Sequence, residues 1–107
     1  MSETFRQIRQ LVNADSIRVS RHAFRRMGQQ NIVSDDLLAG IDSALVIEDY
    51  PDHFAGPSVL VLHFDREQRP IHAVWGLVKD TDGPAVLITA YRPDPSLWSA
   101  DFRSRKP

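Results

Sequence analysis

Three side chains that can act on a phosphate group lie within one turn of a predicted helix. His22, Arg25 and Arg26 follow Ser20, and steps of 100° per residue bring them to one face. The opposite face carries Ala23, Phe24 and Met27. Histidine exchanges protons near neutral pH because its reference pKa is about 6.5, and arginine donates forked hydrogen bonds to phosphate oxygens. This group could therefore hold a phosphodiester and transfer a proton on it, whereas the alternative is a solvated helix face.

A second group of this kind lies near the ends of two predicted strands. His72 belongs to one strand, and Tyr91 and Arg92 end the next one. The register decides whether they meet, because a slip of one residue moves a side chain to the other face of the sheet. With His72 directly opposite Tyr91, the three groups would polarise a ribose hydroxyl and stabilise a phosphorane-like transition state. In the alternative interpretation, His72 is a half-buried core residue and Tyr91 an amphipathic strand residue.

The sequence lacks the motifs of several other classes of site. Its four histidines show no short ligand spacing such as i, i+4 on a helix, so we expect no metal site. Its glycines are isolated and no Gly-x-Ser-x-Gly elbow occurs, so we expect no cofactor and rank a small-molecule hydrolase last. His63 alternates with Val59 and Val61 and is predicted to be structural. Trp75 fits the core pattern, and Trp98 is expected to fasten the polar tail to the body.

Periodicity predicts helices first and strands afterwards. Apolar residues at helical spacing predict a helix over residues 3–13, residues 17–19 form a brief extended piece, and Ser20 is a predicted N-cap for a helix over residues 21–29. A third helix is expected to start at a Ser34 cap. Its predicted buried stripe is Leu37, Leu38, Ile41 and Leu45. Alternation and turn residues predict four strands, at residues 46–50, 59–64, 70–78 and 84–91. We therefore expect a two-layer α+β domain, with N-terminal helices packed on a C-terminal four-stranded antiparallel sheet.

Length and composition are typical of one small domain. The 107 residues suit a single domain over residues 1–107, and a sequence without cysteine excludes disulfides and thiolate chemistry. No apolar run reaches the roughly 18 residues of a membrane span, and a signal peptide is not evident, so we expect a cytoplasmic protein with no membrane partner. Residues 1–33 carry six arginines against two carboxylates, and residues 34–67 carry one arginine against eight carboxylates. This uneven distribution does not describe a uniformly basic nucleic-acid binder.

Five segments, taken in order, resemble the motifs of one protein family. They are residues 17–27 with the run Ser20-Arg21-His22-Ala23, then Ser34-Asp35-Asp36, Glu48-Asp49-Tyr50-Pro51, Pro70-Ile71-His72-Ala73-Val74 and Ile88-Thr89-Ala90-Tyr91-Arg92-Pro93. In order and spacing they resemble the DUF-4258 family, a domain of unknown function, over residues 17–98. Members of that family look like small bacterial and archaeal proteins that are often paired with small zinc-finger, antitoxin-like partners.

The resemblance implies a RelE-like arrangement of sheet and helices, similar to the RelE, BrnT and MqsR toxins. Those toxins look like metal-independent ribonucleases that use scattered Arg, Lys, His and Tyr side chains. The residues implied as catalytic are His22, His72 and Tyr91, and those implied to bind phosphate or RNA are Arg25, Arg26 and Arg92. The implied partners are RNA or ribosome-bound mRNA and an antitoxin protein, with a homodimer as a further expectation, and neither a cofactor nor a metal is implied.

Two functions of different classes follow as hypotheses. The first is a toxin-like, metal-independent endoribonuclease domain of a toxin–antitoxin pair. In it Arg26 and Arg92 bind phosphate, His22 or His72 is the acid or base, and Tyr91 assists. The second is a non-catalytic interaction module, in which the acidic residues 34–67 dock a basic partner or the helices dimerise.

Overall fold

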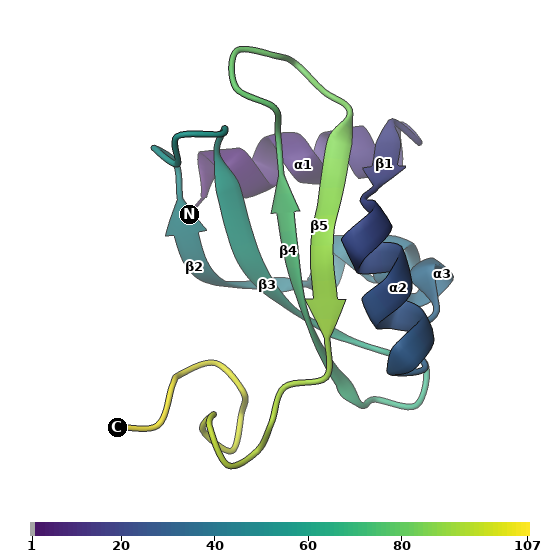
Figure 1. The fold of residues 1–107 in the computed structure, drawn as a ribbon, viewed down its shortest axis with the longest axis vertical. Coiled ribbons are helices and arrows are strands. Elements are labelled where there is room, and N and C mark those ends of the chain that lie inside the picture. Colours follow the sequence, from purple (N-terminus) through teal and green to yellow (C-terminus); the bar gives the residue numbers. More distant parts are fainter. Residues whose placement is uncertain (1) are drawn as a thin grey trace.

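The computed structural model of the chain describes residues 2–107, and these form an α+β fold around one five-stranded sheet (Figure 1). The elements in chain order are α1 (Glu3–Asn13), β1 (Ile17–Val19), α2 (Arg21–Gln29), α3 (Ser34–Ala39), the 3-10 turn η1 (Ile41–Ser43), β2 (Leu45–Tyr50), β3 (Ser58–Phe64), β4 (Pro70–Gly76) and β5 (Ala85–Tyr91). The α+β class expected from the sequence is confirmed.

The sheet differs from the predicted one in its number of strands and in its pairing. Its order is β1-β5-β4-β3-β2, and β2 to β5 form the expected antiparallel meander. The expectation of four antiparallel strands is wrong, because β1 adds a fifth strand that pairs in parallel with β5. Unpaired backbone groups at the edge of β5 need partners. The Ser16 carbonyl accepts from Ala85 N–H at 3.0 Å and starts this pairing, which a three-residue segment does not reveal by its periodicity.

One face of the sheet holds the core, and α1 crosses behind that face (Figure 1). Ile8 of α1 and Val61, Trp75 and Leu87 of the sheet are all buried in one cluster. Ser2 caps α1 by accepting a hydrogen bond from Phe5 N–H at 3.0 Å. Burying each large apolar side chain contributes roughly 1.5–3 kcal/mol to the free energy of unfolding. These contacts therefore fix α1 against the core face of the sheet. We call the opposite side the front face.

The third helix is shorter than predicted, and two residues assigned to it have other roles. It ends at Ala39 with Gly40 as its C-cap, because glycine costs roughly 1 kcal/mol in a helix interior. Leu45 begins β2, pairs with Leu62 and is 41% exposed, so its placement in a buried helical stripe is wrong. Ser34 is the first helical residue and makes no capping bond, since the N-cap is Val33.

The second helix lies beside the lower half of β5, where β1 has ended (Figure 1). Its Ala23 and Met27 are buried in the core as expected. Phe24, which the 100° steps place on the same helix face as these two, is 74% exposed and does not join them in the core. A helix at the edge of a sheet is covered on one side only, and Phe24 falls on the uncovered side.

Among the helices described within residues 2–107, none is both long and apolar enough to cross a membrane.

Candidate functional site

Ser20 fixes where the second helix begins relative to the last strand. Its backbone N–H donates to Leu87 O at 3.0 Å, and its hydroxyl donates to Ile88 O at 2.7 Å. The same hydroxyl oxygen accepts from Ala23 N–H at 2.9 Å, which is the predicted N-cap. One side chain therefore caps α2 and ties it to β5, and the side chains of the first two turns of α2 are placed against β5.

His22 and Arg26, four residues apart on α2, lie on the side of the helix that meets the front face of β5. His22 Nε2 is 3.0 Å from Thr89 Oγ1. The Arg26 guanidinium lies over the Tyr91 ring, with Cζ 5.6 Å from the ring centroid. Arg26 forms no ion pair with any residue in the described range 2–107. Its charge is therefore uncompensated at this place.

The strand register brings the second group of candidate residues to the same face. His72 pairs directly with Tyr91, which is the register that joins the imidazole and the phenol. A cleft of about 440 Å³ opens here between α2, β5 and the C-terminal segment. It is lined by His22, Arg26, Thr89, Tyr91, Arg92, Asp94, Leu97, Trp98 and Arg105. Helix α2 and β5 thus direct His22, Arg26 and Tyr91 into one concavity, and His72 lies beneath it.

His72 is fully buried and both of its ring nitrogens are engaged. Nε2 is 2.8 Å from Phe102 O, and Nδ1 is 3.3 Å from the Tyr91 hydroxyl. Burial lowers the pKa of His72, so the ring is neutral at pH 7. A carbonyl oxygen only accepts, hence Nε2 carries the ring proton and Nδ1 accepts from the Tyr91 hydroxyl. His72 therefore orients Tyr91 and does not face the cleft.

Tyr91 keeps its proton at neutral pH. Burial raises the pKa of Tyr91 above its ordinary value of 10.0, because a phenolate loses its hydration when it is removed from water. Arg26 and Arg105 act in the opposite direction without reversing the shift. The hydroxyl is thus a proton donor whose orientation is set by His72.

Arg92 is committed to structural contacts although it also borders the cleft. Its guanidinium donates to Asn31 O at 3.0 Å and to Pro70 O at 3.4 Å, and lies 2.9 Å from an Asp65 carboxylate oxygen. Gln30 accepts from the Arg92 backbone N–H. These bonds join the end of β5 to the end of α2 and to the β3–β4 turn. Little of the Arg92 fork remains available for a ligand.

Arg25 does not line the cleft. It is exposed on the outer flank of α2, because its helical position is rotated away from the His22–Arg26 side. Of the three arginines implied to bind phosphate, only Arg26 combines an uncompensated charge with a place in the cleft.

The C-terminal segment contributes residues that sequence reasoning did not select as functional. Trp98 is 4% exposed, and its ring meets that of His72 edge-on at 4.4 Å. This contact is the expected clasp. The Arg105 guanidinium lies over the Trp98 ring, with Cζ 4.7 Å from the centroid, and pairs with Glu48 at 2.9 Å. No local motif marks Arg105, because its position depends on the tail folding back in a bridge between Trp98 and Arg105.

The other buried histidine lies on the core side of the sheet. Trp75 Nε1 donates to His63 Nε2 at 3.2 Å, and both side chains are buried. His63 Nδ1 then carries the proton and has no partner within the described residues. His63 and Trp75 are thus structural, as predicted. Across residues 2–107, no three His, Asp or Glu side chains gather in a group suited to a metal ion.

The cleft therefore combines a base, an acid and two guanidinium groups. His22 can accept a proton, Tyr91 can donate one, and Arg26 and Arg105 can balance negative charge. This set is competent for acid–base chemistry on a phosphate ester.

The fold and the site together define a class: an α+β domain with a cleft of His, Tyr and Arg side chains on its front face. The chain belongs to the family described as Domain of unknown function (DUF4258), whose model matches residues 19–92. That range begins just before the Ser20 cap and ends at Arg92, so it contains His22, Arg26, His72 and Tyr91. Neither the curated proteins nor the solved structures gave a match to the chain.

Proposed function

We propose that the protein is a toxin-like, metal-independent endoribonuclease of a toxin–antitoxin pair, acting through the cleft between α2, β5 and the tail. One observation carries the proposal: His22, Arg26 and Tyr91 line one cleft. Each is a residue type that can take part in cleaving a phosphodiester. Two of them lie on successive turns of α2, and Tyr91 lies at the end of β5.

RNA supplies its own nucleophile for such a reaction. The 2′-hydroxyl attacks the adjacent phosphorus, and His22 Nε2 accepts its proton. The bond from phosphorus to the 5′-oxygen breaks. The Tyr91 hydroxyl turns its one proton from His72 Nδ1 into the cleft and donates it to that oxygen. The products are a 2′,3′-cyclic phosphate and a 5′-hydroxyl. His22 Nε2 contacts Thr89, and the Cα atoms of Thr89 and Tyr91, two residues apart on β5, are about 6.6 Å apart. Base and acid are thus held at neighbouring positions on one face of the strand.

The positive charge in the cleft supports binding of the transition state. Arg26 has no anionic partner in the described part of the chain, and Arg105 is 62% exposed in its pair with Glu48. An exposed pair of this kind is worth roughly 0–1 kcal/mol, so Arg105 can turn toward a phosphate at little cost. Arginine forks suit the two equatorial oxygens of a phosphorane.

The remaining candidates take supporting roles in this proposal. His72 is a positioning residue, because it holds the Tyr91 hydroxyl and is itself buried. Arg92 anchors α2 to the strand that carries Tyr91. Arg25, exposed beside the cleft, contacts the flanking RNA at most through its charge. RNA or ribosome-bound mRNA is then the substrate, and the antitoxin is the protein that blocks the cleft.

Purified, partner-free protein incubated with mRNA tests the proposal, in EDTA for free mRNA and in Mg²⁺ buffer for ribosome-bound mRNA. We expect fragments with 5′-hydroxyl ends in at least one condition, and growth arrest when the protein is expressed without a partner. Intact RNA in both conditions together with normal growth would remove the ribonuclease proposal.

A non-catalytic interaction module is the second candidate, and exposed aromatic side chains favour it. Phe24 on α2 is 74% exposed and Phe54 in the β2–β3 loop is 84% exposed, which is unusual for large apolar residues without a partner. Replacing both His22 and His72 with Ala separates the two functions. A lost phenotype with fold and partner binding retained favours catalysis, and an unchanged phenotype favours binding alone.

A further inference from the structure

One edge of the sheet is open along its whole length. Among the described residues 2–107, β2 pairs with β3 only, and no further strand lies beyond it (Figure 1). Apart from its pairing with β3 and a turn bond from His53 N–H to Tyr50 O, the described backbone gives β2 no further hydrogen bond. Such an edge is a template for another strand. β2 contains neither lysine nor proline, and its bulge and inward-facing Asp49 limit pairing to a partner that neutralises the carboxylate.

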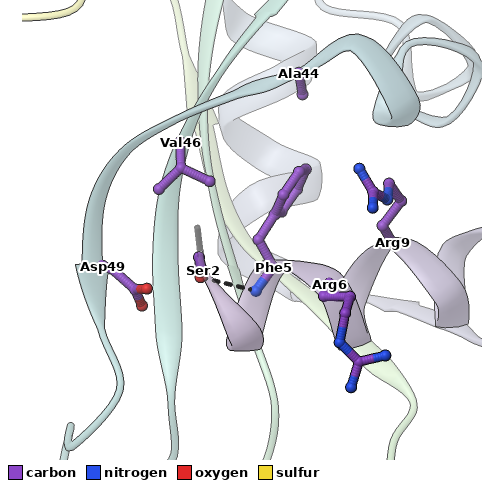
Figure 2. Close-up of a pocket in the computed structure, with 7 residues that line it drawn as sticks. All are labelled: Ser2, Phe5, Arg6, Arg9, Ala44, Val46 and Asp49. Carbon is purple, nitrogen blue, oxygen red and sulfur yellow. Dashed lines mark hydrogen bonds between the residues drawn. The ribbon is translucent and has the colours of Figure 1, made fainter.

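A groove runs along this open edge, between β2 and the N-terminal half of α1 (Figure 2). Its volume is about 470 Å³, and its apolar side chains are Phe5, Ala44 and Val46. Asp49 and Arg9 stand at its two ends, with the apolar side chains between them (Figure 2). The groove therefore offers an acid at one end, a base at the other and an apolar centre.

An irregularity in β2 brings Val46 and Asp49 to the same face. Residues three apart on a regular strand point to opposite faces. Here the register shifts between Val46 and Glu48, so that Val46 pairs with Val61 and Asp49 pairs with Val59. Both partners belong to the buried core face. The bulge thus turns both side chains toward α1 and the groove.

Neither charge at the ends of the groove is satisfied by the chain itself. Asp49 is exposed, and within residues 2–107 it forms no ion pair and no side-chain hydrogen bond. Arg9 likewise has no ion pair in that range and lies 6.0 Å from the centre of the Phe5 ring. The neighbouring Arg6 differs, since it pairs with Glu3.

We propose that a second copy of this chain occupies the groove, with the two β2 strands paired antiparallel about a twofold axis. Antiparallel pairing reverses the order of side chains, so Asp49 of the second copy comes opposite Val46 and beside Arg9. The symmetry repeats the contact, because the first copy's Asp49 then lies beside Arg9 of the second copy. The β2 edge of one copy is therefore complementary to the β2 edge of the other. Their pairing joins two five-stranded sheets into one continuous sheet.

Charge selects this register over its neighbours. With Val46 opposite Asp49 of the second copy, Glu48 lies opposite Ile47, and no two carboxylates face each other. A shift that places Glu48 opposite Asp49 brings like charges together, which destabilises a strand pair. Glu48 points to the front face, where Arg105 already holds it.

Two charge reversals test the interface by sedimentation velocity across a range of protein concentrations. We expect the unmodified protein to dimerise, and Arg9→Asp and Asp49→Arg each to weaken the dimer about tenfold or more, because each variant alone brings like charges together. An equimolar mixture of the two variants should form a heterodimer, since both contacts are then complementary. Arg18→Asp, which reverses the charge of an exposed arginine on β1 at the opposite edge of the sheet, is the matched control and should still dimerise.

Introduced cysteines provide a second measurement, based on distance and not on charge reversal. The sequence contains no cysteine of its own. Directly opposed residues of antiparallel strands have Cα atoms about 4.5–5.5 Å apart, which suits a disulfide. Mixed Val46→Cys and Asp49→Cys proteins should form a mixed disulfide under mild oxidation, whereas Asp49→Cys alone should not. A monomeric unmodified protein at all concentrations, or single charge variants that dimerise as tightly as the unmodified chain, overturns the proposal.

Discussion

At the scale of single residues, the direction of one hydrogen bond determines the chemistry available in the cleft. The Phe102 carbonyl requires a proton on His72 Nε2, so Nδ1 accepts and the Tyr91 hydroxyl donates. Burial keeps the imidazole neutral and the phenol protonated, by lowering the pKa of His72 and raising that of Tyr91. The buried His72 thus orients the Tyr91 hydroxyl, while the exposed His22 lines the cleft.

Tyr91→Phe removes the hydroxyl and keeps the ring under Arg26. We expect RNA cleavage to fall by about 10²–10⁴-fold, as for the loss of a general acid. The free energy of unfolding should fall by about 1–3 kcal/mol, because the buried His72 Nδ1 loses its donor. Cleavage rates and urea unfolding measure the two effects. Tyr50→Phe is the control, because Tyr50 bonds Glu48 outside the cleft. Equal rates for Tyr91→Phe and the unmodified enzyme contradict the role of the phenol.

His63 predicts a pH dependence of stability. Burial lowers the pKa of His63 from 6.5 to about 4. Between these values the unfolded chain binds a proton that the folded chain does not, so the free energy of unfolding falls as the pH falls through this window. From pH 7 to pH 5 this effect amounts to about 2 kcal/mol. Burial also lowers the pKa of His72, which acts in the same direction.

The substitution His63→Gln keeps an acceptor for Trp75 Nε1 and removes the titrating group. Urea unfolding at pH 7 and pH 5 should then show a much smaller difference in stability than for the unmodified protein. His53→Gln alters an exposed histidine and should leave the difference unchanged. An undiminished pH dependence in His63→Gln would assign it to other groups.

At the scale of elements, Ser20 connects the helix that carries His22 to the strand that carries Tyr91. Ser20→Ala removes the cap of α2 and the bond to Ile88 O. We expect a loss of about 1 kcal/mol in the free energy of unfolding and slower RNA cleavage, because His22 is no longer held at Thr89. Thermal unfolding and cleavage rates are the measurements. Ser34→Ala is the control, since α3 has no side-chain cap, and an equal effect of both changes contradicts the role of Ser20.

The sequence predicts those elements whose local patterns agree with their surroundings. The spacing of apolar residues in α1 and the Ser20 cap of α2 lead to the observed helices. Leu45 was misplaced because an apolar residue after Gly40 fits a helix or a strand equally well, and pairing with Leu62 decides between them. The fifth strand escaped prediction because three residues carry no period, and only the edge of β5 makes Ile17–Val19 a strand.

The site was predictable to the extent that local spacing and register place its residues. His22 and Arg26 share a helix side by spacing alone, and the His72–Tyr91 contact needed only the correct register. Long-range contacts make Arg92 a structural residue and add Arg105, which the sequence did not select, to the cleft. The Asp65 carboxylate occupies Arg92, and the folding back of the tail brings Arg105 to the cleft. Sequence spacing contains neither contact.

At the scale of the whole molecule, the two faces of the sheet have different covers. Helix α1 lies behind the core face (Figure 1), and the C-terminal segment packs on the front face through the contact of Trp98 with His72. The Trp98 ring seals His72 from water and supports Arg105. The tail is therefore a wall of the cleft as well as part of the fold.

Trp98→Ala should release the tail while the rest of the sheet stays folded. We expect a loss of about 3–5 kcal/mol in the free energy of unfolding, as for other buried Trp side chains. Amide exchange should rise across residues 94–107, at the start of β4 and at the end of β5. It should stay slow in α1. Hydrogen exchange read by mass spectrometry resolves these segments. Uniform loss of protection in α1 contradicts the independent docking of the tail.

Single-turnover cleavage of one RNA oligonucleotide in EDTA tests the central claim most directly. It compares the unmodified protein with His22→Ala, Arg26→Ala and, as a control outside the cleft, Arg25→Ala. We expect cleavage that leaves 5′-hydroxyl ends and little change for Arg25→Ala. Cleavage should fall by about 10²–10⁴-fold on losing the base and by about 10²–10³-fold on losing the phosphate donor. Cleavage that persists undiminished in His22→Ala and Arg26→Ala would contradict the assignment of this cleft as the active site.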